Sequence, residues 1–261
     1  MRIHAFTPGL VTFVACALLP GFAYAQSNNS VVIWPINPVI ESGQHATPLR
    51  LENPGKQPIL MQIRIFGWQQ IDGDERFVEQ KDVTGTPPMV RIEPGQQQLI
   101  RLTRIAPQPA GTEDSYRIII DEIPLADVPP PSDTGAAPQT AGAAIRFRMR
   151  YSVPLFTYGE GFAAPAPGDK AVAGSALQWR VVKTSEGTDL EVRNPGTRHS
   201  RLSGVVQKRP DGISSKVEGA HGYILAGATM RFPITQAVAS QARLFADVEG
   251  DAAQPMTPRQ P

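Results

Sequence analysis

One stretch near the middle of the chain alternates strictly between apolar and polar residues. It follows a long loop rich in proline, alanine and glycine. Successive side chains of a strand point to opposite faces of a sheet, so the alternation predicts a strand with one apolar and one basic face. The apolar face holds Ile145, Phe147, Met149, Tyr151 and Val153, and the other holds Arg146, Arg148, Arg150 and Ser152. Such a strand either closes the chain's own core or offers its edge and apolar side chains to another polypeptide.

The rest of the first half consists of short β-branched segments separated by turn residues such as Asn53-Pro54-Gly55 and Pro94-Gly95. No stretch keeps apolar residues at helical spacing for three turns. The expected strands are Val31–Trp34, Pro48–Glu52, Ile59–Trp68, Met89–Ile92, Gln98–Ile105 and Tyr116–Ile123. With the Ile145–Val153 strand they make seven in roughly 125 residues, which is typical of an immunoglobulin-like sandwich.

A second series of strands follows a Gly/Ala/Pro stretch from Gly159 to Gly168 that reads as a linker. The expected strands are Leu177–Lys183, Asp189–Asn194, Arg201–Lys208, Tyr223–Leu225, Met230–Ile234 and Arg243–Glu249. The pattern predicts an all-β protein with an N-terminal immunoglobulin-like domain over 26–158 and a C-terminal β-sandwich domain over 159–250. The Leu125–Ala144 connection is expected to be mobile, and the tail 251–261 is expected to be disordered.

The two halves share a short motif. Leu190-Glu-Val-Arg followed by Asn194-Pro195-Gly196 echoes Leu51-Glu-Asn-Pro-Gly55. The repeat suggests two related sandwiches with the same turn after an early strand. Chance recurrence of a common turn tripeptide is the alternative.

Residues 1–25 have the pattern of a cleaved secretory signal peptide. Arg2 precedes an apolar run from Leu10 to Leu19, and Ala23-Tyr24-Ala25 fits the small-x-small cleavage site. The apolar run is too short to span a bilayer, so an exported chain with no stable membrane insertion is expected. The single cysteine, Cys16, lies inside the signal. The mature chain therefore has no thiol for a disulfide or a metal.

Charge and motifs argue against several function classes. The chain after residue 25 carries 24 basic and 24 acidic residues, which gives no electrostatic support for nucleic-acid binding. No histidine has a second ligand at metal-binding spacing, and no nucleophile elbow or phosphate loop is present. Asp121 and Glu122 are adjacent on one strand and so face opposite sides of the sheet, which favours an ion pair with a nearby arginine over a catalytic dyad. We expect neither an enzyme nor a cofactor.

Several motifs follow one another in a fixed order over about residues 31–156. They are Val31-Val-Ile-Trp-Pro-Ile-Asn-Pro-Val-Ile40, Leu49-Arg-Leu-Glu-Asn53, Gln62-Ile-Arg-Ile-Phe-Gly-Trp68, Pro87-Pro88, Ile92-Glu-Pro-Gly95, Ile100-Arg-Leu102 and Tyr116-Arg117 with Asp121-Glu-Ile-Pro124. Together these motifs resemble the N-terminal domain of PapD-like periplasmic pilus chaperones of the chaperone–usher pathway. The Pro35-Ile-Asn-Pro38 and Tyr151-Ser-Val-Pro154 segments look more like the archaic branch of this pathway.

The resemblance implies two sandwiches in an L-shaped arrangement and an ATP-independent chaperone of the periplasm. Such a chaperone lends its alternating strand, here Ile145–Val153, to an incomplete pilin subunit and delivers that subunit to an outer-membrane usher. By the same resemblance, Pro87 and Pro88 form a turn that faces the usher. The family's basic anchors for the subunit's C-terminal carboxylate are missing, because Asn37 or Pro38 and Ser152 stand near their positions. Arg91, Arg101 and Arg150 are the candidate replacements.

Two other classes of function compete with this one. A structural pilus subunit is disfavoured by the two-domain length and the lack of a disulfide. An exported carbohydrate-binding protein would need clustered solvent-facing aromatic residues, whereas Trp34, Trp68 and Trp179 are far apart in the sequence and each is expected to pack in a core.

Overall fold

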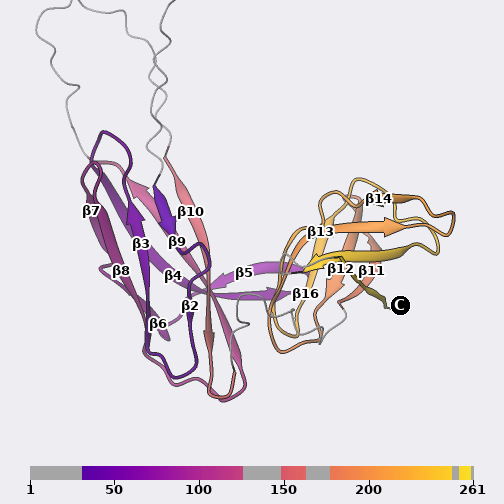
Figure 1. Ribbon diagram of the computed structural model, residues 1–261, viewed down its shortest axis with the longest axis horizontal. Coiled ribbons are helices and arrows are strands. Elements are labelled where there is room, and N and C mark those ends of the chain that lie inside the picture. The colour runs from indigo at the N-terminus through magenta and orange to yellow at the C-terminus, as the bar shows by residue number, and fades with distance from the viewer. Residues whose placement is uncertain (1–30, 126–147, 163–176, 249–252, 260–261) are drawn as a thin grey trace, which may run out of the picture.

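The computed structural model describes residues 31–125, 148–162, 177–248 and 253–259. Within these ranges every regular element is a β-strand, and the strands form two sandwiches that meet at a marked angle, giving the molecule an L shape (Figure 1). The expected fold class is therefore confirmed. No helix in the described ranges is long and apolar enough to cross a membrane. The mobile connection expected over Leu125–Ala144 lies outside the described residues, apart from Leu125 itself.

The first sandwich consists of two sheets. Sheet 1 has the order β1 (Val32–Trp34), β3 (Ala46–Glu52), β8 (Gln97–Arg104) and β6 (Val83–Thr86). Sheet 2 has the order β2 (Val39–Ile40), β10 (Arg150–Tyr158), β9 (Glu113–Ile123), β4 (Ile59–Ile71) and β5 (Asp74–Val78), and β7 (Met89–Ile92) also pairs with β4. Alternate residues of these strands turn inward and bury Leu49, Leu51, Ile100, Ile118 and Ile120 completely. The first core is thus built by the period-two pattern of the sequence.

The second sandwich also has two sheets. Sheet 3 has the order β16 (Thr229–Pro233), β12 (Thr188–Arg193), β11 (Gln178–Lys183) and β19 (Thr257–Pro258). Sheet 4 has the order β14 (Ser214–Lys216), β13 (Ser200–Lys208), β17 (Arg243–Val248) and β18 (Gln254–Pro255), and β15 (Gly222–Ile224) also pairs with β13. Leu190, Val192, Val205 and Leu244 are among its fully buried residues.

The expectation of a disordered tail fails for residues 253–259. This segment forms β18 and β19, one in each sheet of the second sandwich, and Met256 between them is only 6% exposed within the second core. Its two proline-containing dipeptides gave no strand signal in the sequence. A single buried methionine and the pairing of β18 and β19 with neighbouring strands hold it in place.

Each expected strand overlaps an observed one, but six observed strands were not expected: β2, β5, β6, β14, β18 and β19. All five residues of β5 are exposed, so this strand has no burial pattern to read. The expected Ile145–Val153 strand is observed as β10, which begins at Arg150 and continues to Tyr158. Every residue from Val153 to Tyr158 is buried, and a strand buried on both faces loses its alternation while remaining a strand.

The repeated Asn-Pro-Gly motif makes the same turn in both sandwiches. Asn53 is fully buried, and its Nδ2 donates to the carbonyls of Gln57 at 2.8 Å and Ile92 at 3.0 Å. Asn194 is also fully buried, and its Nδ2 donates to the carbonyls of Arg198 at 2.6 Å and Ile224 at 3.0 Å. In each turn the glycine N–H donates to the asparagine Oδ1. The bond to the carbonyl four residues on and the bond from the glycine occur at the same offsets in both turns, and each Nδ2 also reaches a carbonyl of a distant strand, which favours a structural repeat over chance recurrence.

A third apolar cluster joins the two sandwiches. Trp68, Phe156, Tyr158 and Phe162, from the first sandwich and the segment after β10, pack with Leu225 from the second. Tyr223 meets Trp68 edge to face, with the ring centroids 5.5 Å apart. Because these side chains are buried together, the junction is a packed core rather than a loose contact.

Polar contacts reinforce the junction on both sides of this cluster. The Gln70 side chain donates to the carbonyl of Tyr223 and accepts from the amide of Leu225, both at 2.8 Å. The backbone N–H of Arg231 donates to the carbonyl of Gly73 at the tip of the β4–β5 hairpin, at 3.0 Å. The buried Glu113 carboxylate accepts from the backbone N–H of His199 at 2.7 Å and lies 2.8 Å from its Nδ1. The two sandwiches are therefore held at a defined angle.

Candidate functional site

The strand β10 has one edge that is largely unpaired. It pairs with β9 along its whole length, from Arg150 to Tyr158, but with β2 only at Phe156 and Thr157. Among the described residues, no strand pairs with the outer edge from Arg150 to Leu155. Unpaired backbone groups on an edge are a template for a strand of another chain.

The apolar face that runs from Val153 of β10 to Met149, just before the strand, passes from the interior of the first sandwich to its surface. Val153 is 7% exposed in the first core, Tyr151 packs partly against that core, and Met149 is 40% exposed. The Tyr151 hydroxyl also accepts from the backbone N–H of Val31 at 2.9 Å. Val153 thus serves the chain's own core, whereas Met149 has left it. Ile145 and Phe147 lie outside the described residues.

Arg150 belongs to a three-residue ion-pair cluster on the outer face of sheet 2. Its Nε donates to Oδ1 of Asp121, and Nη2 of Arg64 donates to Oδ2 of the same carboxylate at 2.7 Å. Burial alone would raise the pKa of Asp121, but the hydrogen bonds and charges of Arg150 and Arg64 outweigh it and lower the pKa. The Asp121 carboxylate is therefore ionised at neutral pH and paired with arginines, as expected. Arg64 was not among the residues expected at this site.

The other two candidate anchors lie elsewhere. Nε of Arg91, on β7, donates to Oε1 of Glu93 at 2.7 Å, and both side chains are about half exposed. The Arg91 position is three strands away from β10 in sheet 2, which corresponds to about 14 Å at the usual strand spacing. Arg101 is exposed on β8 in the opposite sheet. The structure does not bring the three arginines together.

Pro87 and Pro88 form the corner between the two sheets of the first sandwich. The chain leaves sheet 1 at the end of β6 and enters sheet 2 at the start of β7. The carbonyl of Pro88 accepts from the N–H of Ile63 at 2.8 Å, while its ring is exposed. The pair therefore combines a structural role with an apolar surface that lacks backbone donors.

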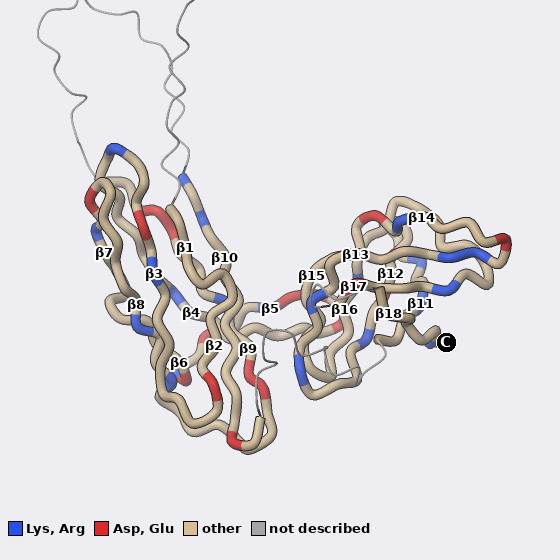
Figure 2. The backbone as a smooth tube through the Cα atoms, in the orientation of Figure 1, with Lys and Arg blue, Asp and Glu red and all other residues tan. Residues whose placement is uncertain are grey.

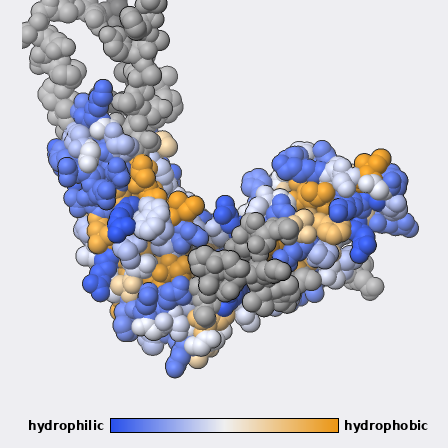
Figure 3. Space-filling model, viewed as in Figure 1, coloured by the Kyte–Doolittle hydropathy of each residue, from blue (hydrophilic) through white to orange (hydrophobic). Residues whose placement is uncertain are grey.

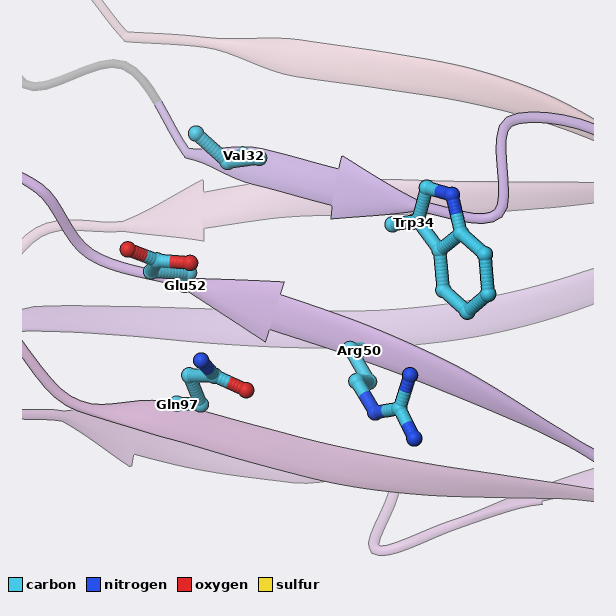
Figure 4. A pocket seen from close by; sticks show the side chains of 5 residues that line it. All are labelled: Val32, Trp34, Arg50, Glu52 and Gln97. Carbon is cyan, nitrogen blue, oxygen red and sulfur yellow. The ribbon is translucent and has the colours of Figure 1, made fainter.

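Sheet 1 presents a small aromatic pocket on its outer face. Val32 and Trp34 of β1, Arg50 and Glu52 of β3, and Gln97 of β8 line it (Figure 4). The Arg50 guanidinium carbon is 5.3 Å from the Trp34 ring centroid. Trp34 is 59% exposed, which corrects the expectation that it packs in a core, whereas Trp68 is buried and Trp179 packs against the second core. Trp34 is exposed because its strand, β1, lies at the edge of sheet 1, and the side chains on the outer face of this strand point to solvent.

The described residues offer no arrangement for metal chemistry, because no group of three or more His, Cys, Asp or Glu residues among them could hold an ion. Apolar and hydrophilic residues are interspersed over the visible face of the first sandwich (Figure 3). The feature that stands out from this background is the unpaired edge of β10 with its emerging apolar face.

Comparison with known proteins agrees with these features. Residues 30–161 match the family described as "Pili and flagellar-assembly chaperone, PapD N-terminal domain". The chain is 26% identical over 214 residues to the chaperone protein FimB/FhaD of Bordetella pertussis, covering 81% of this chain and 78% of that protein.

Two solved structures share the fold. A chain of the CsuC–CsuE chaperone–tip adhesion subunit pre-assembly complex, from archaic chaperone–usher Csu pili of Acinetobacter baumannii, is 30% identical, with a TM-score of 0.69 over 88% of this chain and 100% of that chain. The CupB2 chaperone of Pseudomonas aeruginosa is 20% identical, with a TM-score of 0.53 over 86% and 96% of the two chains, and this likeness concerns the fold. The unpaired strand edge, the two-sandwich architecture and the family match lead to one conclusion: this chain belongs to the PapD-like pilus-assembly chaperones.

Proposed function

We propose that this chain is an ATP-independent periplasmic chaperone that holds a pilin subunit by strand donation and delivers it to an outer-membrane usher. The observation that carries the proposal is the edge of β10, which is unpaired from Arg150 to Leu155 while its apolar face emerges from the core at Met149. A relative at 30% identity comes from a complex with a tip subunit. Burial of apolar surface, about 25 cal/mol per Å², and edge hydrogen bonds drive such a capture without nucleotide.

The donated segment is Ile145–Val153, and its residues have different roles. We assign Ile145, Phe147 and Met149 to the subunit's groove. Tyr151 and Val153 anchor the segment in the chaperone's own first core, because they pack there in the free chain. Residues 1–25 act as the cleaved export signal in this proposal.

Replacing Met149 with glutamate tests strand donation. The variant should keep the wild-type unfolding transition and lose capture of the pilin, because its side chain is exposed in the free chain but buried in the complex. Val181→Glu is the matched control, since Val181 is an apolar residue with the same 40% exposure as Met149 but lies on β11 of the second sandwich, and it should retain capture. Co-purification from periplasmic extract is the readout. Retained capture by Met149→Glu, or equal loss in both variants, refutes donation through the apolar face.

For the subunit's C-terminal carboxylate we favour Arg150 over Arg91 and Arg101. Arg150 lies on the donated strand, is 69% exposed, and uses only Nε on Asp121. Amidating the pilin C-terminus should weaken binding to the wild type and barely change binding to Arg150→Gln. Equal weakening in both proteins excludes Arg150 as the anchor.

We assign Pro87 and Pro88 to the surface that docks on the usher, because a stiff corner loses little conformational entropy on binding. Replacing both with alanine should leave pilin capture intact and reduce pilus assembly. Loss of pilin capture with normal affinity for the usher would show that the corner has a purely structural role.

A further inference from the structure

The outer face of sheet 3 carries a carboxylate surrounded by three arginines. Glu191 lies on the inner strand β12, and its side chain is only 4% exposed. Arg180 on β11 and Arg231 on β16 are its direct cross-strand neighbours. Nε of Arg180 donates to Oε1 of Glu191 at 2.6 Å, and Nε of Arg231 donates to Oε2 at 3.2 Å. Nη1 of Arg259, just after β19, lies 3.8 Å from Oε1.

This cluster has a surplus of positive charge. Burial alone would raise the pKa of Glu191, but the hydrogen bonds and charges of Arg180 and Arg231 outweigh it and lower the pKa, so one negative charge faces three positive ones. Asp189 and Arg193 lie two residues to either side of Glu191 on the same strand face, and their charges cancel. Asp72 and Asp74 flank Gly73, which contacts Arg231, and they offset positive charge at that end of the cluster. The surplus is therefore greatest at Arg180 and Arg259.

The arginines are held in place and still have free hydrogen-bond donors. Arg180 and Arg231 bond to Glu191 through Nε, and among the described residues their Nη groups have no acceptor. All three side chains are more than a third exposed. A guanidinium that is already oriented loses less entropy when its outward N–H groups bind a second carboxylate.

The spacing of the arginines indicates the shape of the ligand. Their backbone positions form a row across the strand order β16, β12, β11 and β19 (Figure 2 marks Lys and Arg in blue along the backbone). Their head groups converge on the two oxygens of Glu191 and so lie closer together than the outermost strands of this row. In an extended peptide, side chains two residues apart point the same way and lie about 7 Å apart. Two acidic residues at alternate positions can therefore each reach one of the converging guanidinium groups, whereas a small free anion would reach only one of them at a time.

We infer that Arg180, Arg231 and Arg259 form a docking site for an extended acidic segment of a partner protein, with Glu191 as their positioning residue. This site lies on the second sandwich, away from the β10 edge, and it does not rest on the proposed function of that edge. It gives the second sandwich a binding role of its own.

Calorimetric titration at low ionic strength tests the site with a capped heptapeptide in which glutamate alternates with serine. The wild-type chain should bind it, and Arg180→Gln should weaken binding about tenfold or more, since a hydrogen bond between two charged groups is lost. Arg180→Lys keeps the positive charge but lacks the planar guanidinium that can make two parallel hydrogen bonds, so it should recover only part of the affinity. Arg243→Gln, an exposed arginine on β17 in sheet 4, is the matched control and should bind like the wild type.

Three outcomes overturn the inference. The first is no binding of the heptapeptide, and the second is equal weakening in Arg180→Gln and Arg243→Gln. The third is that inorganic phosphate or vesicles of anionic lipid bind the wild type at least as tightly as the heptapeptide, which would assign the row to a different ligand. A glutamine-for-glutamate version of the heptapeptide should not bind.

Discussion

Replacing Gln70 with alanine should allow the angle between the two sandwiches to vary more widely. In the structure this side chain makes two hydrogen bonds of 2.8 Å across the junction, to the carbonyl of Tyr223 and the amide of Leu225. Each such bond contributes about 1 kcal/mol net, and Leu225 is almost fully buried, so its amide has little access to water as a substitute. The two bonds together predict a loss of about 2 kcal/mol in the free energy of unfolding.

Urea denaturation followed by tryptophan fluorescence measures this loss, since Trp68 lies in the junction. Small-angle scattering should show a broader distribution of shapes for Gln70→Ala than for the wild type. The matched control is Gln69→Ala, because Gln69 is the exposed neighbour on the same strand and should change stability by less than about 0.5 kcal/mol. A Gln70→Ala loss as small as that of the control, with an unchanged scattering profile, would refute the view that these bonds hold the junction.

Two further predictions concern side chains that act within one sandwich. Asn53→Ala and Asn194→Ala should each lower the free energy of unfolding by about 3 kcal/mol, since each removes at least three hydrogen bonds from a buried turn. A loss below about 1 kcal/mol by urea denaturation would contradict the shared-turn assignment. Asp121 has a pKa below its usual 3.8, so its pairing stabilises the fold above that pH, and this stability is lost as the pH falls through the lowered pKa. Asp121→Asn should be less stable than the wild type at neutral pH, and the gap should narrow below about pH 4; a gap that stays constant down to pH 2 would exclude the linkage.

The sequence predicts the parts of the fold that have one buried face. Strands such as β3 and β8 alternate between core and solvent and were expected close to their observed bounds. Exposed β5 and the short β18 and β19 lack that contrast, so nothing in their sequence separates them from loops. Tertiary pairing, not local preference, makes them strands.

The candidate site, like the fold, could be predicted from the sequence only in part. The alternation located the β10 region, but it could not show where the strand leaves the core, because Val153 and Met149 occupy equivalent positions in the pattern. The partnership of Arg64 with Asp121 spans 57 positions in the chain and depends on the register of β4 with β9. Likewise, Arg180 and Arg231 converge on Glu191 only because β12 lies between their strands. Side-chain clusters assembled across strands leave no local signal in the sequence.

The burial of β10 on both faces determines how far it can slide. Val153 and Leu155 point into the first core, while Phe156 and Tyr158 point into the junction between the sandwiches. A shift of one residue would exchange these two sets, and a shift of two would carry Arg150 to the position of Ser152 and break its pairing with Asp121. The C-terminal half of the strand therefore fixes the register of β10: both cores together resist a pull along the strand, so the chaperone itself sets the point at which Met149 leaves the first core.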